Sequence, residues 1–149
     1  MHLKLQTDYA LRVLLYLGYV DAGGAGPAAP VDAMAGAFAI SREHLVKVVQ
    51  ELVRLGLVRT RPGRRGGVEM LPAGRAATVA DVVAHFEGRR TVLPCVLQPQ
   101  VCVLEPGCDL RRLLMSAEDA FFRSLDTTTI ADLCRPKAKQ GGLRNLSLK

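Results

Sequence analysis

The sequence predicts a mainly α-helical protein that carries one short β-hairpin. Apolar residues recur at helical spacing in several separate stretches of the 149-residue chain, which indicates amphipathic helices. Two short runs of β-type residues flank a glycine-rich turn between residues 57 and 71, and this pattern is typical of a hairpin. A loop that contains three cysteines and several prolines follows, and no regular element is expected there.

Composition is that of a globular protein, and we expect it to reside in the cytoplasm. Hydrophobic residues make up 49% of the sequence, which is enough to bury a core. No apolar stretch is long enough to span a bilayer, so no membrane association is expected. The first residues lack the cationic and apolar segments of a signal peptide. In a reducing compartment, cysteines serve as metal ligands or redox sensors more often than as disulfides.

The first predicted helix covers about residues 8–20, with Thr7 as its N-cap and Asp8 in its first turn. Its apolar stripe consists of Ala10, Val13, Leu14 and Leu17. Residues 21–30 are rich in glycine, alanine and proline, and we expect them to form a flexible connection. A short second helix is predicted over residues 31–38.

The best-defined helix begins after Ser41, a typical N-cap, and is ended by Gly56. Its outer face carries Arg42, His44 and Lys47 near the start of the helix. A short helix, a tight link and a capped helix with basic residues near its start form the helix-turn-helix arrangement, in which the second helix enters the major groove of DNA. An ordinary helical hairpin with a solvated charged face explains these residues almost equally well. The predicted buried face is Leu45, Val48, Val49, Leu52 and Leu55.

The hairpin that follows favours DNA binding over that alternative. Four arginines fall within residues 59–65, which contain no acid, as expected of a surface that binds an anion. A helix-turn-helix followed by an arginine-rich hairpin is a winged helix, and we predict this domain over residues 1–88. In this fold the second helix reads bases, and the hairpin reaches phosphate or the minor groove. The residues expected to contact double-stranded DNA are Ser41, Arg42, His44, Lys47, Arg61, Arg64, Arg65 and Gly66.

The C-terminal half is predicted to contain a loop and a dimerisation helix. A helix over residues 79–87 closes the winged-helix core and leads into a cysteine loop at residues 89–108. A dimerisation region is expected at residues 109–134, followed by a flexible basic tail at residues 135–149. The long helix that begins at residue 109 carries an apolar stripe, which packs either on its own domain or across the two-fold axis of a dimer. A homodimer would present two recognition helices to a palindromic operator. This stripe consists of Leu110, Leu113, Leu114, Ala117, Phe121 and Leu125.

Cys95, Cys102 and Cys108 follow a C-x6-C-x5-C pattern, and three thiols in one loop indicate a metal or cluster site. Structural zinc sites use closer cysteine pairs, so an iron–sulfur cluster is favoured over zinc. No histidine is clearly placed to activate a catalytic cysteine, so no enzymatic activity is predicted. A four-iron cluster needs a fourth ligand from outside the loop. Cys134 is one candidate, although we expect it to be a buried thiol.

Four motifs, taken in order, resemble those of one known family. They are Thr7-Asp-Tyr-Ala-Leu-Arg12, Ser41-Arg-Glu-His-Leu-Val-Lys47, Gly66-Gly67 and the three loop cysteines. Their joint order resembles the iron–sulfur winged-helix regulators over residues 3–133, and within that family the nitric-oxide-sensing repressors. The resemblance implies a four-iron [4Fe-4S] cluster held by Cys95, Cys102, Cys108 and an Asp8 that the other subunit of a dimer supplies. Arg12 lies one helical turn after Asp8, where it would hydrogen-bond that carboxylate.

Two positions depart from the family pattern. In IscR-type members, a histidine three residues after the last cysteine completes a [2Fe-2S] cluster, and Arg111 takes that place here, so this cluster type is less expected. In family members, the arginine directly before the first glycine of the hairpin enters the minor groove, whereas this chain has Pro62 there. Arg61, Arg64 and Arg65 are the candidates to make that contact instead.

The sequence therefore predicts a homodimeric transcriptional repressor that binds a palindromic operator. On the resemblance, nitric oxide is the effector, and nitrosylation or loss of the cluster releases the DNA. Three alternatives stay open: an iron- or redox-responsive regulator of the same family, a zinc-stabilised winged-helix protein that binds DNA without sensing, and a protein-interaction module.

Overall fold

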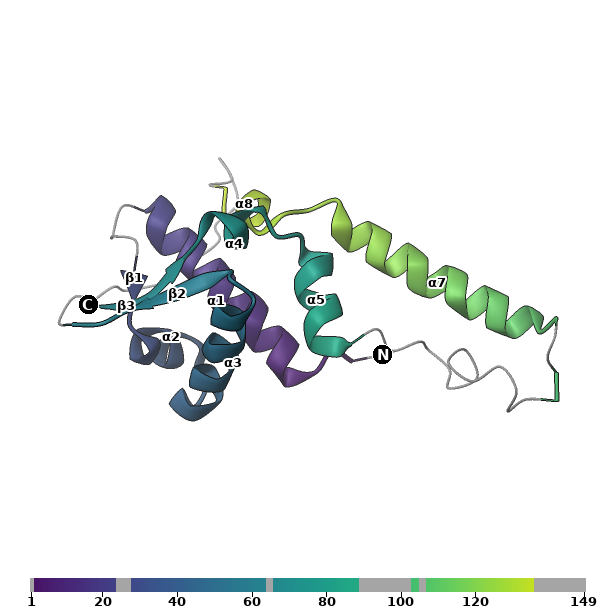
Figure 1. Ribbon diagram of the computed structural model, residues 1–149, viewed down its shortest axis with the longest axis horizontal. Helices are drawn as coiled ribbons and strands as arrows, with labels where there is room; N and C mark the ends of the chain where they lie inside the picture. The colour runs from purple at the N-terminus through teal and green to yellow at the C-terminus, as the bar shows by residue number, and fades with distance from the viewer. Residues whose placement is uncertain (1, 24–27, 64–65, 89–102, 105–106, 136–149) are drawn as a thin grey trace.

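The computed structural model describes residues 2–23, 28–63, 66–88, 103–104 and 107–135. The predicted class is confirmed, because these residues form helices and one small antiparallel sheet (Figure 1). The helices are α1 (Leu5–Ala22), α2 (Val31–Phe38), α3 (Arg42–Arg54), α4 (Pro72–Ala76), α5 (Val79–Glu87), α7 (Asp109–Asp126) and α8 (Ile130–Leu133). The strands are β1 (Ala28–Ala29), β2 (Val58–Arg61) and β3 (Gly67–Met70).

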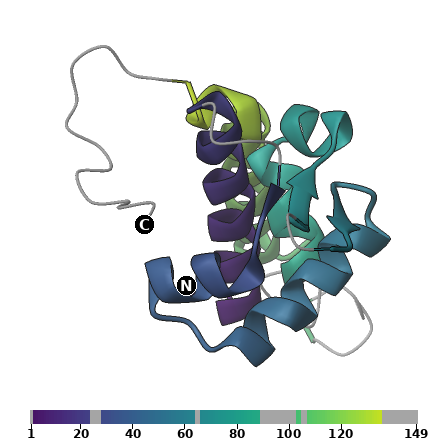
Figure 2. The same cartoon turned by 90° about the vertical axis from the view of Figure 1, so that its left-hand side faces the viewer.

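Helix α1 runs through the centre of the winged-helix portion, with α3, α5, α8 and the sheet packed around it (Figures 1 and 2). Ala10, Val13 and Leu14 are 0% exposed, and Leu17 is buried beside them, so the predicted stripe of this helix is confirmed. Burial of such apolar surface stabilises a fold by about 25 cal/mol per Å². The centre of the core is therefore the first helix, with α3 and the hairpin strand β3 packed on it.

Thr7 does not cap α1, contrary to the prediction. The helix begins at Leu5 after an extended Lys4. Thr7 is completely buried inside the first turn, where its hydroxyl donates a hydrogen bond to the Glu87 carboxylate. The backbone N–H of Lys4 donates to the same carboxylate oxygen at 2.7 Å. A carboxylate from a distant part of the chain thus binds the start of α1, which the local sequence does not reveal.

Helices α2 and α3 meet at a tight turn, in agreement with the helix-turn-helix prediction. Ala39 adopts the left-handed conformation with a φ of 53°, and the Ile40 N–H donates to the Ala35 carbonyl at 3.1 Å. Ser41 caps α3 by accepting a hydrogen bond from the His44 N–H at 3.3 Å. The predicted cap of this helix is confirmed.

The end of α3 follows the glycine signal in the sequence. Gly56 has a φ of 71°, a conformation that a side chain would disfavour. Its N–H donates to the Val53 carbonyl at 2.9 Å, and the N–H of Leu57 donates to the Leu52 carbonyl at 3.0 Å. These two bonds satisfy carbonyls at the helix end and turn the chain into the hairpin.

The sheet has the strand order β1-β3-β2 with both pairs antiparallel. The hairpin of β2 and β3 was predicted, and its register places Arg59 opposite Glu69. Val58 and Met70 are buried on the inner face of the hairpin. Because side chains alternate along a strand, Arg59, Arg61 and Glu69 share the outer face.

Strand β1 lies within residues 21–30, which were expected to form a flexible connection. Ala28 pairs with Glu69 and Ala29 with Val68, so this short strand covers the open edge of β3. Alanine is depleted in strands, and two alanines beside prolines carry no strand signal of their own. The pairing therefore comes from tertiary packing, which places this segment beside β3.

Helix α7 projects from the compact domain, and the chain rejoins this domain at α8. Figure 1 shows α7 extending away from the winged helix. No residue of α7 is buried, whereas Ile130 at the start of α8 is 0% exposed. The return is fixed by backbone bonds from the Val79 N–H to the Thr128 carbonyl at 3.0 Å and from the Ile130 N–H to the Ala77 carbonyl at 2.9 Å. Within the described ranges, no helix combines the length and apolar character needed to cross a membrane.

Candidate nucleic-acid interface

The side chains predicted to contact DNA from the start of α3 all lie at the surface. Ser41, Arg42, His44 and Lys47 are exposed. Arg42 Nε lies 2.9 Å from Oδ1 of Asp32 on α2, and both side chains are more than 60% exposed. An ion pair this exposed is weak and is readily exchanged for a phosphate contact. The first two turns of α3 therefore present cationic and hydrogen-bonding groups to solvent.

A second set of contacts ties α3 to α5. His85 Nε2 lies 2.5 Å from Glu51 Oε1, and Arg54 Nη2 donates to the same oxygen at 2.9 Å. Lys47 and Glu51 line a small cavity of about 200 Å³ together with His85. The position of the recognition helix is thus linked to the last turn of α5.

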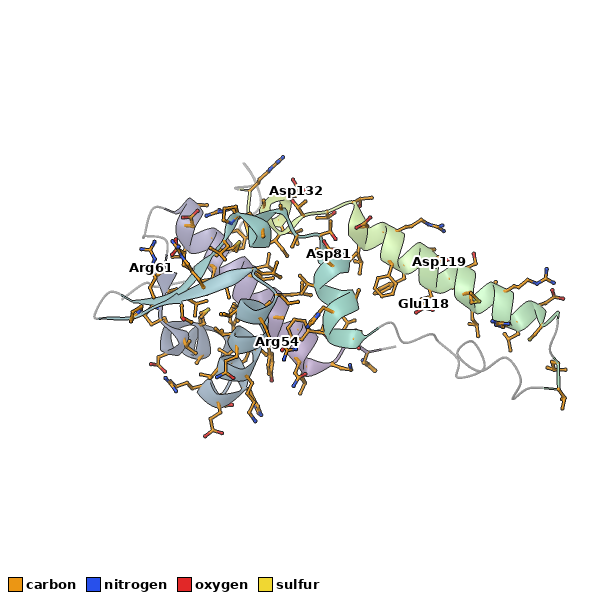
Figure 3. All side chains as sticks on the ribbon, in the orientation of Figure 1. Arg54, Arg61, Asp81, Glu118, Asp119 and Asp132 are labelled. Atoms are coloured by element: carbon orange, nitrogen blue, oxygen red, sulfur yellow. The ribbon has the colours of Figure 1, made fainter. Side chains whose placement is uncertain are left out.

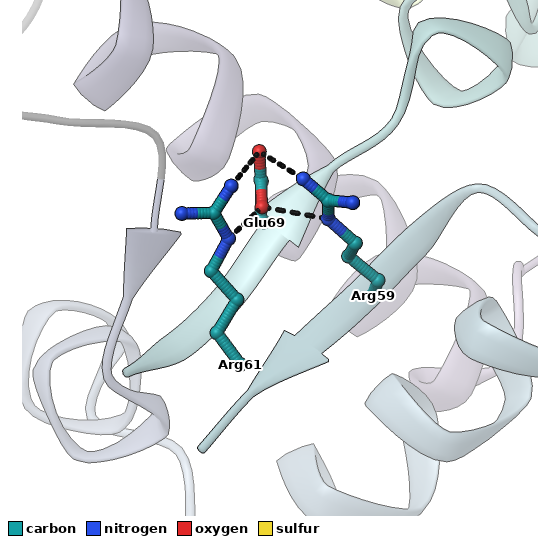
Figure 4. A network of polar contacts seen from close by, with 3 residues as sticks. All are labelled: Arg59, Arg61 and Glu69. Atoms are coloured by element: carbon teal, nitrogen blue, oxygen red, sulfur yellow. Dashed lines mark hydrogen bonds and ion pairs between the residues drawn. The ribbon is translucent and has the colours of Figure 1, made fainter. Parts of the chain in front are cut away.

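The hairpin carries a three-residue ion network on its outer face (Figure 4). Arg59 donates from Nε to Glu69 Oε2 at 2.8 Å and from Nη2 to Oε1 at 3.1 Å. Arg61 contacts the same carboxylate through Nε and, at 3.2 Å, through Nη2. The Glu69 side chain is only 12% exposed, whereas those of Arg59 and Arg61 are 52% and 46% exposed. The carboxylate is therefore enclosed between two guanidinium groups that still face solvent.

This network fixes the charge state of its members. The hydrogen bond from Arg59 is the main cause that lowers the pKa of Glu69; burial opposes it, and Arg61 lowers the pKa further. The same contact raises the pKa of Arg59. Glu69 is consequently ionised at neutral pH and neutralises one of the two guanidinium charges.

Gly66 has a structural role in closing the hairpin turn. Its N–H donates to the Gly63 carbonyl at 2.8 Å. A Cβ at this position would lie 2.2 Å from the carbonyl oxygen of Arg61, so any larger residue would force the backbone to move. Arg64 and Arg65 lie outside the described residues, and their DNA contacts stay predictions.

Asp8 and Arg12 form an ion pair on the surface of α1. Arg12 Nε donates to both carboxylate oxygens of Asp8 at 2.9 Å. The two side chains are 40% and 45% exposed, and the Arg12 guanidinium carbon also lies 5.7 Å from the centre of the Phe38 ring. The predicted hydrogen bond between Arg12 and Asp8 is thus present within one chain. The exposure of Asp8 leaves it open to a ligand from outside.

The two cysteines in the described residues have different surroundings. Cys108 is half-buried and directly precedes α7, while Cys134 is buried in the core with its sulfur 3.8 Å from the Leu15 carbonyl. Burial raises the pKa of the Cys134 thiol, and the prediction of a buried thiol at this position is confirmed. Cys95 and Cys102 lie outside the described residues.

The described ligand candidates suit an iron–sulfur cluster by type but are not brought together in one chain. A half-buried thiol and a partly exposed carboxylate are both ligands that iron accepts. Figure 1 places the start of α7, next to Cys108, away from the first turn of α1, which carries Asp8. Among the residues that the structure describes, no three or more histidines, cysteines or acids gather into a metal site.

Comparison with known proteins identifies the family. A family model described as "Rrf2: Iron-dependent Transcriptional regulator" matches residues 3–136. The chain belongs to the Rrf2 family. It is 39% identical over 139 residues to the HTH-type transcriptional regulator NsrR of Geobacillus kaustophilus, which covers 93% of this chain and 92% of that protein. Its identity to NsrR of Oceanobacillus iheyensis is 35% over 136 residues, or 91% of this chain and 90% of that protein.

Solved structures share the Rrf2 fold. CymR of B. subtilis, described as the global cysteine regulator, superposes with a TM-score of 0.73 at 24% identity, covering 90% of this chain and 96% of that chain. T. potens IscR superposes with a TM-score of 0.66 at 20% identity, covering 89% of this chain and 85% of that chain. At these identities the likeness establishes the fold alone. The winged-helix prediction is confirmed by it.

These findings decide several predictions at once. The predicted family is confirmed by the match to the iron-dependent Rrf2 family, and the resemblance within that family is confirmed by the relatives named NsrR. Rrf2 proteins are transcriptional regulators, so the prediction that this chain is not an enzyme is confirmed too. The chain is a DNA-binding transcriptional regulator of an iron-dependent family.

Two acidic residues of the site were missed by the sequence analysis. Glu69 neutralises hairpin arginines, and Glu87 binds the start of α1. The first could have been found from the hairpin, because pairing β2 with β3 places an acid directly opposite Arg59. The second leaves no signal in the sequence, since its partners lie 80 or more residues away.

Proposed function

We propose that this Rrf2 protein is a homodimeric, cytoplasmic repressor that binds a palindromic operator and releases it in response to nitric oxide. The observation that carries the proposal is the joint placement of two basic elements. The exposed start of α3 and the arginine-bearing hairpin lie toward the same end of the molecule, opposite α7 (Figures 1 and 2). A recognition helix in the major groove and a hairpin along the adjacent backbone fit this arrangement.

The ligands in this proposal are Cys95, Cys102 and Cys108 of one subunit with Asp8 of the other. The separation of Asp8 from the start of α7 within one chain supports a ligand set that a dimer completes. When bound, an iron–sulfur cluster supplies iron that reacts with nitric oxide. An oxygen ligand is a weaker partner for iron than a thiolate, so the Asp8 position would be the first to open. Arg12 would orient the Asp8 carboxylate in either state.

Contacts within the described residues supply a route from the cysteine loop to α3. Glu87 is the last residue of α5 and lies just before the cysteine loop in the sequence. It accepts hydrogen bonds from Lys4 and Thr7, and it therefore connects this point of the chain to the first turn of α1, where Asp8 lies. Near the end of the same helix, His85 contacts Glu51 on α3. Asp8 and the cysteine loop are thus both connected to the recognition helix α3 through contacts of α5. A coupling of about 1–3 kcal/mol between the two sites would change operator affinity roughly 5–150-fold.

The family description as iron-dependent supports a second candidate, an iron- or redox-responsive regulator of the same fold. It uses the same ligands and the same DNA-binding face but a different signal. The two candidates separate on the response of the purified protein to nitric oxide and to iron chelation.

Anaerobic purification tests the proposed function. We expect a coloured protein with iron and sulfide in equal amounts, tight binding to a duplex selected from random sequences, and loss of both colour and binding after nitric oxide. Single replacement of Cys95, Cys102 or Cys108 by alanine should give a colourless protein with weak operator binding. Asp8→Ala should leave the fold intact and shorten the lifetime of the colour.

Cys134→Ala is the matched control, because this buried thiol lies outside the proposed ligand set, and the variant should keep colour and binding. A colourless parent with stoichiometric zinc would show a zinc-stabilised protein instead. If the unmodified protein is coloured, and its DNA binding does not respond to nitric oxide but changes on iron chelation, the second candidate is favoured. Failure to select any DNA would leave only a protein-interaction role.

A further inference from the structure

The hairpin network occupies donors that a DNA-binding hairpin would use. Arg59 and Arg61 each give their Nε and one Nη2 group to the carboxylate of Glu69 (Figure 4). A guanidinium has five N–H donors, so each arginine keeps about three for another partner. The Nε and Nη2 groups, which together would form a bidentate contact with a phosphate, are already bound to Glu69.

The network is built into the strands and does not depend on a mobile side chain reaching across solvent. Glu69 sits directly opposite Arg59 in the β2–β3 register, and Arg61 lies two residues further along the same face. The Glu69 side chain is 12% exposed and is also flanked by β1, where Ala28 pairs with its backbone. A partner fixed at this distance competes with any external phosphate at a high effective concentration.

We propose that Glu69 is a specificity-determining residue: it holds Arg59 and Arg61 away from the phosphates of non-specific DNA and yields them only when α3 is seated in its operator. This inference rests on the proposed DNA binding. Non-specific affinity comes almost entirely from phosphate contacts, so an internal carboxylate that occupies two arginines lowers it directly. At the operator, base contacts from α3 hold the hairpin against fixed phosphates, which then compete with the carboxylate for the same donors.

Glu69→Gln tests the inference, because glutamine keeps the shape of the side chain and removes its charge. The probes are a duplex selected from random sequences and an unselected random duplex of equal length. We expect affinity for the random duplex to rise roughly three- to tenfold at low salt. The slope of log affinity against log salt concentration should become steeper by about one, because Glu69 neutralises one guanidinium charge. Affinity for the selected duplex should change less, so the ratio of the two affinities falls.

The matched control is Asp119→Asn, which makes the same change in net charge on α7, away from the hairpin (Figure 3). It should leave both affinities and both salt slopes unchanged. In a protein that already carries Arg59→Ala and Arg61→Ala, Glu69→Gln should have no effect, because the carboxylate acts through these two residues. An equal rise in affinity for both duplexes, or a rise that persists without the arginines, would overturn the inference.

A second comparison avoids replacing Glu69 and therefore does not depend on the folding of that variant. In the parent, Arg61→Ala should lower the salt slope on random DNA by much less than Lys47→Ala. The reason is that Arg61 shares its charge with Glu69, whereas the exposed ammonium group of Lys47 is available to a phosphate. Equal losses of about one for both variants would contradict the inference. A parent that binds neither duplex would instead contradict the proposed function.

Discussion

At the scale of single residues, Gly18 and Cys134 show how closely α8 packs on α1. A Cβ on Gly18 would lie 2.3 Å from the Cys134 sulfur and 3.1 Å from its Cβ. No real side-chain contact is that short, so the glycine is needed for the approach of the two helices. The sulfur in turn fills the space that the glycine leaves and is protected from solvent.

Gly18→Ala should therefore destabilise the protein by about 1–3 kcal/mol, because it overpacks a site that cannot expand without moving α8. Thermal or urea unfolding of the purified variant measures the loss. Combination with Cys134→Ala should restore part of it, since the sulfur that clashes is removed. A double variant no more stable than Gly18→Ala alone would mean that the clash is relieved elsewhere.

Single residues also show which contacts could be predicted from the sequence and which could not. Ser41 and Gly56 were predicted as the bounds of α3 because capping depends on neighbours within a few residues. Thr7 was predicted to cap α1 in the same way, and this prediction was wrong, since Glu87 from α5 binds the start of that helix instead. Local chemistry is readable from local sequence, whereas a contact across 80 residues is not.

At the scale of elements, α8 is a four-residue helix that depends on its cap. Thr129 accepts a hydrogen bond from the Asp132 N–H at 3.1 Å, and the Asp132 carboxylate accepts from the Thr129 N–H at 3.1 Å and from its hydroxyl at 2.6 Å. The hydrogen bond from the Thr129 hydroxyl is the main cause that lowers the pKa of Asp132, and the Thr129 N–H adds to it. The cap holds Ile130 in the core at the point where the chain returns.

The stabilisation from this cap should depend on pH in a predictable direction. Because the folded-state pKa of Asp132 is depressed, its contribution is present above the unfolded value of about 3.9 and is lost as the pH falls through the folded pKa. Asp132→Asn should therefore be less stable than the parent at pH 7, and the gap should close below about pH 4. Urea unfolding at both pH values checks this; a gap that stays constant would remove the ionised cap as its cause.

Elements differed in how far they could be predicted. Helices α2 and α5 were predicted over residues 31–38 and 79–87, which are their bounds in the structure, and the long α7 begins at residue 109, the first residue of the predicted dimerisation region. Strand β1 and helix α4 were missed because both are short and are stabilised by neighbours that are remote in sequence. The side chains predicted to contact DNA were named from their order along the chain, but the ion network that engages one of them, Arg61, depends on strand register.

At the scale of the whole molecule, α7 is a long helix with no buried residue in the described part of the chain. Leu110 and Leu113 are 56% and 66% exposed, although both belong to the predicted apolar stripe. The side of α7 that faces α5 is a different one, where Met115 and Phe122 line a groove of about 620 Å³. Leu110, Leu113 and Ala117 of the stripe are thus exposed, whereas Leu114, Phe121 and Leu125 are partly buried. The exposed part of the stripe is available to the proposed homodimer.

Leu113→Glu should accordingly convert the protein to a monomer with little change in the stability of the winged-helix portion, because the side chain makes few contacts within its own chain. Sedimentation analysis gives the mass, and unfolding curves give the stability. Val53→Glu, which places the same charge at an exposed apolar position of α3, should remain dimeric. A Leu113→Glu protein that still sediments as a dimer would exclude this face of α7 as the interface.

The return of the chain at α8 has a consequence for how such proteins diversify. Both ends of the segment between α5 and α8 are fastened to the same domain. Glu87 at the end of α5 accepts hydrogen bonds from Lys4 and Thr7, and backbone bonds join Ala77 and Val79 to the residues beside α8. The entropy of closing such a loop grows only logarithmically with its length, by about 0.6 kcal/mol for each doubling. Insertions, deletions or new cysteines in this segment would cost the domain little stability. A single DNA-binding core can therefore accept many different chemical inputs at this point of the chain over the course of evolution.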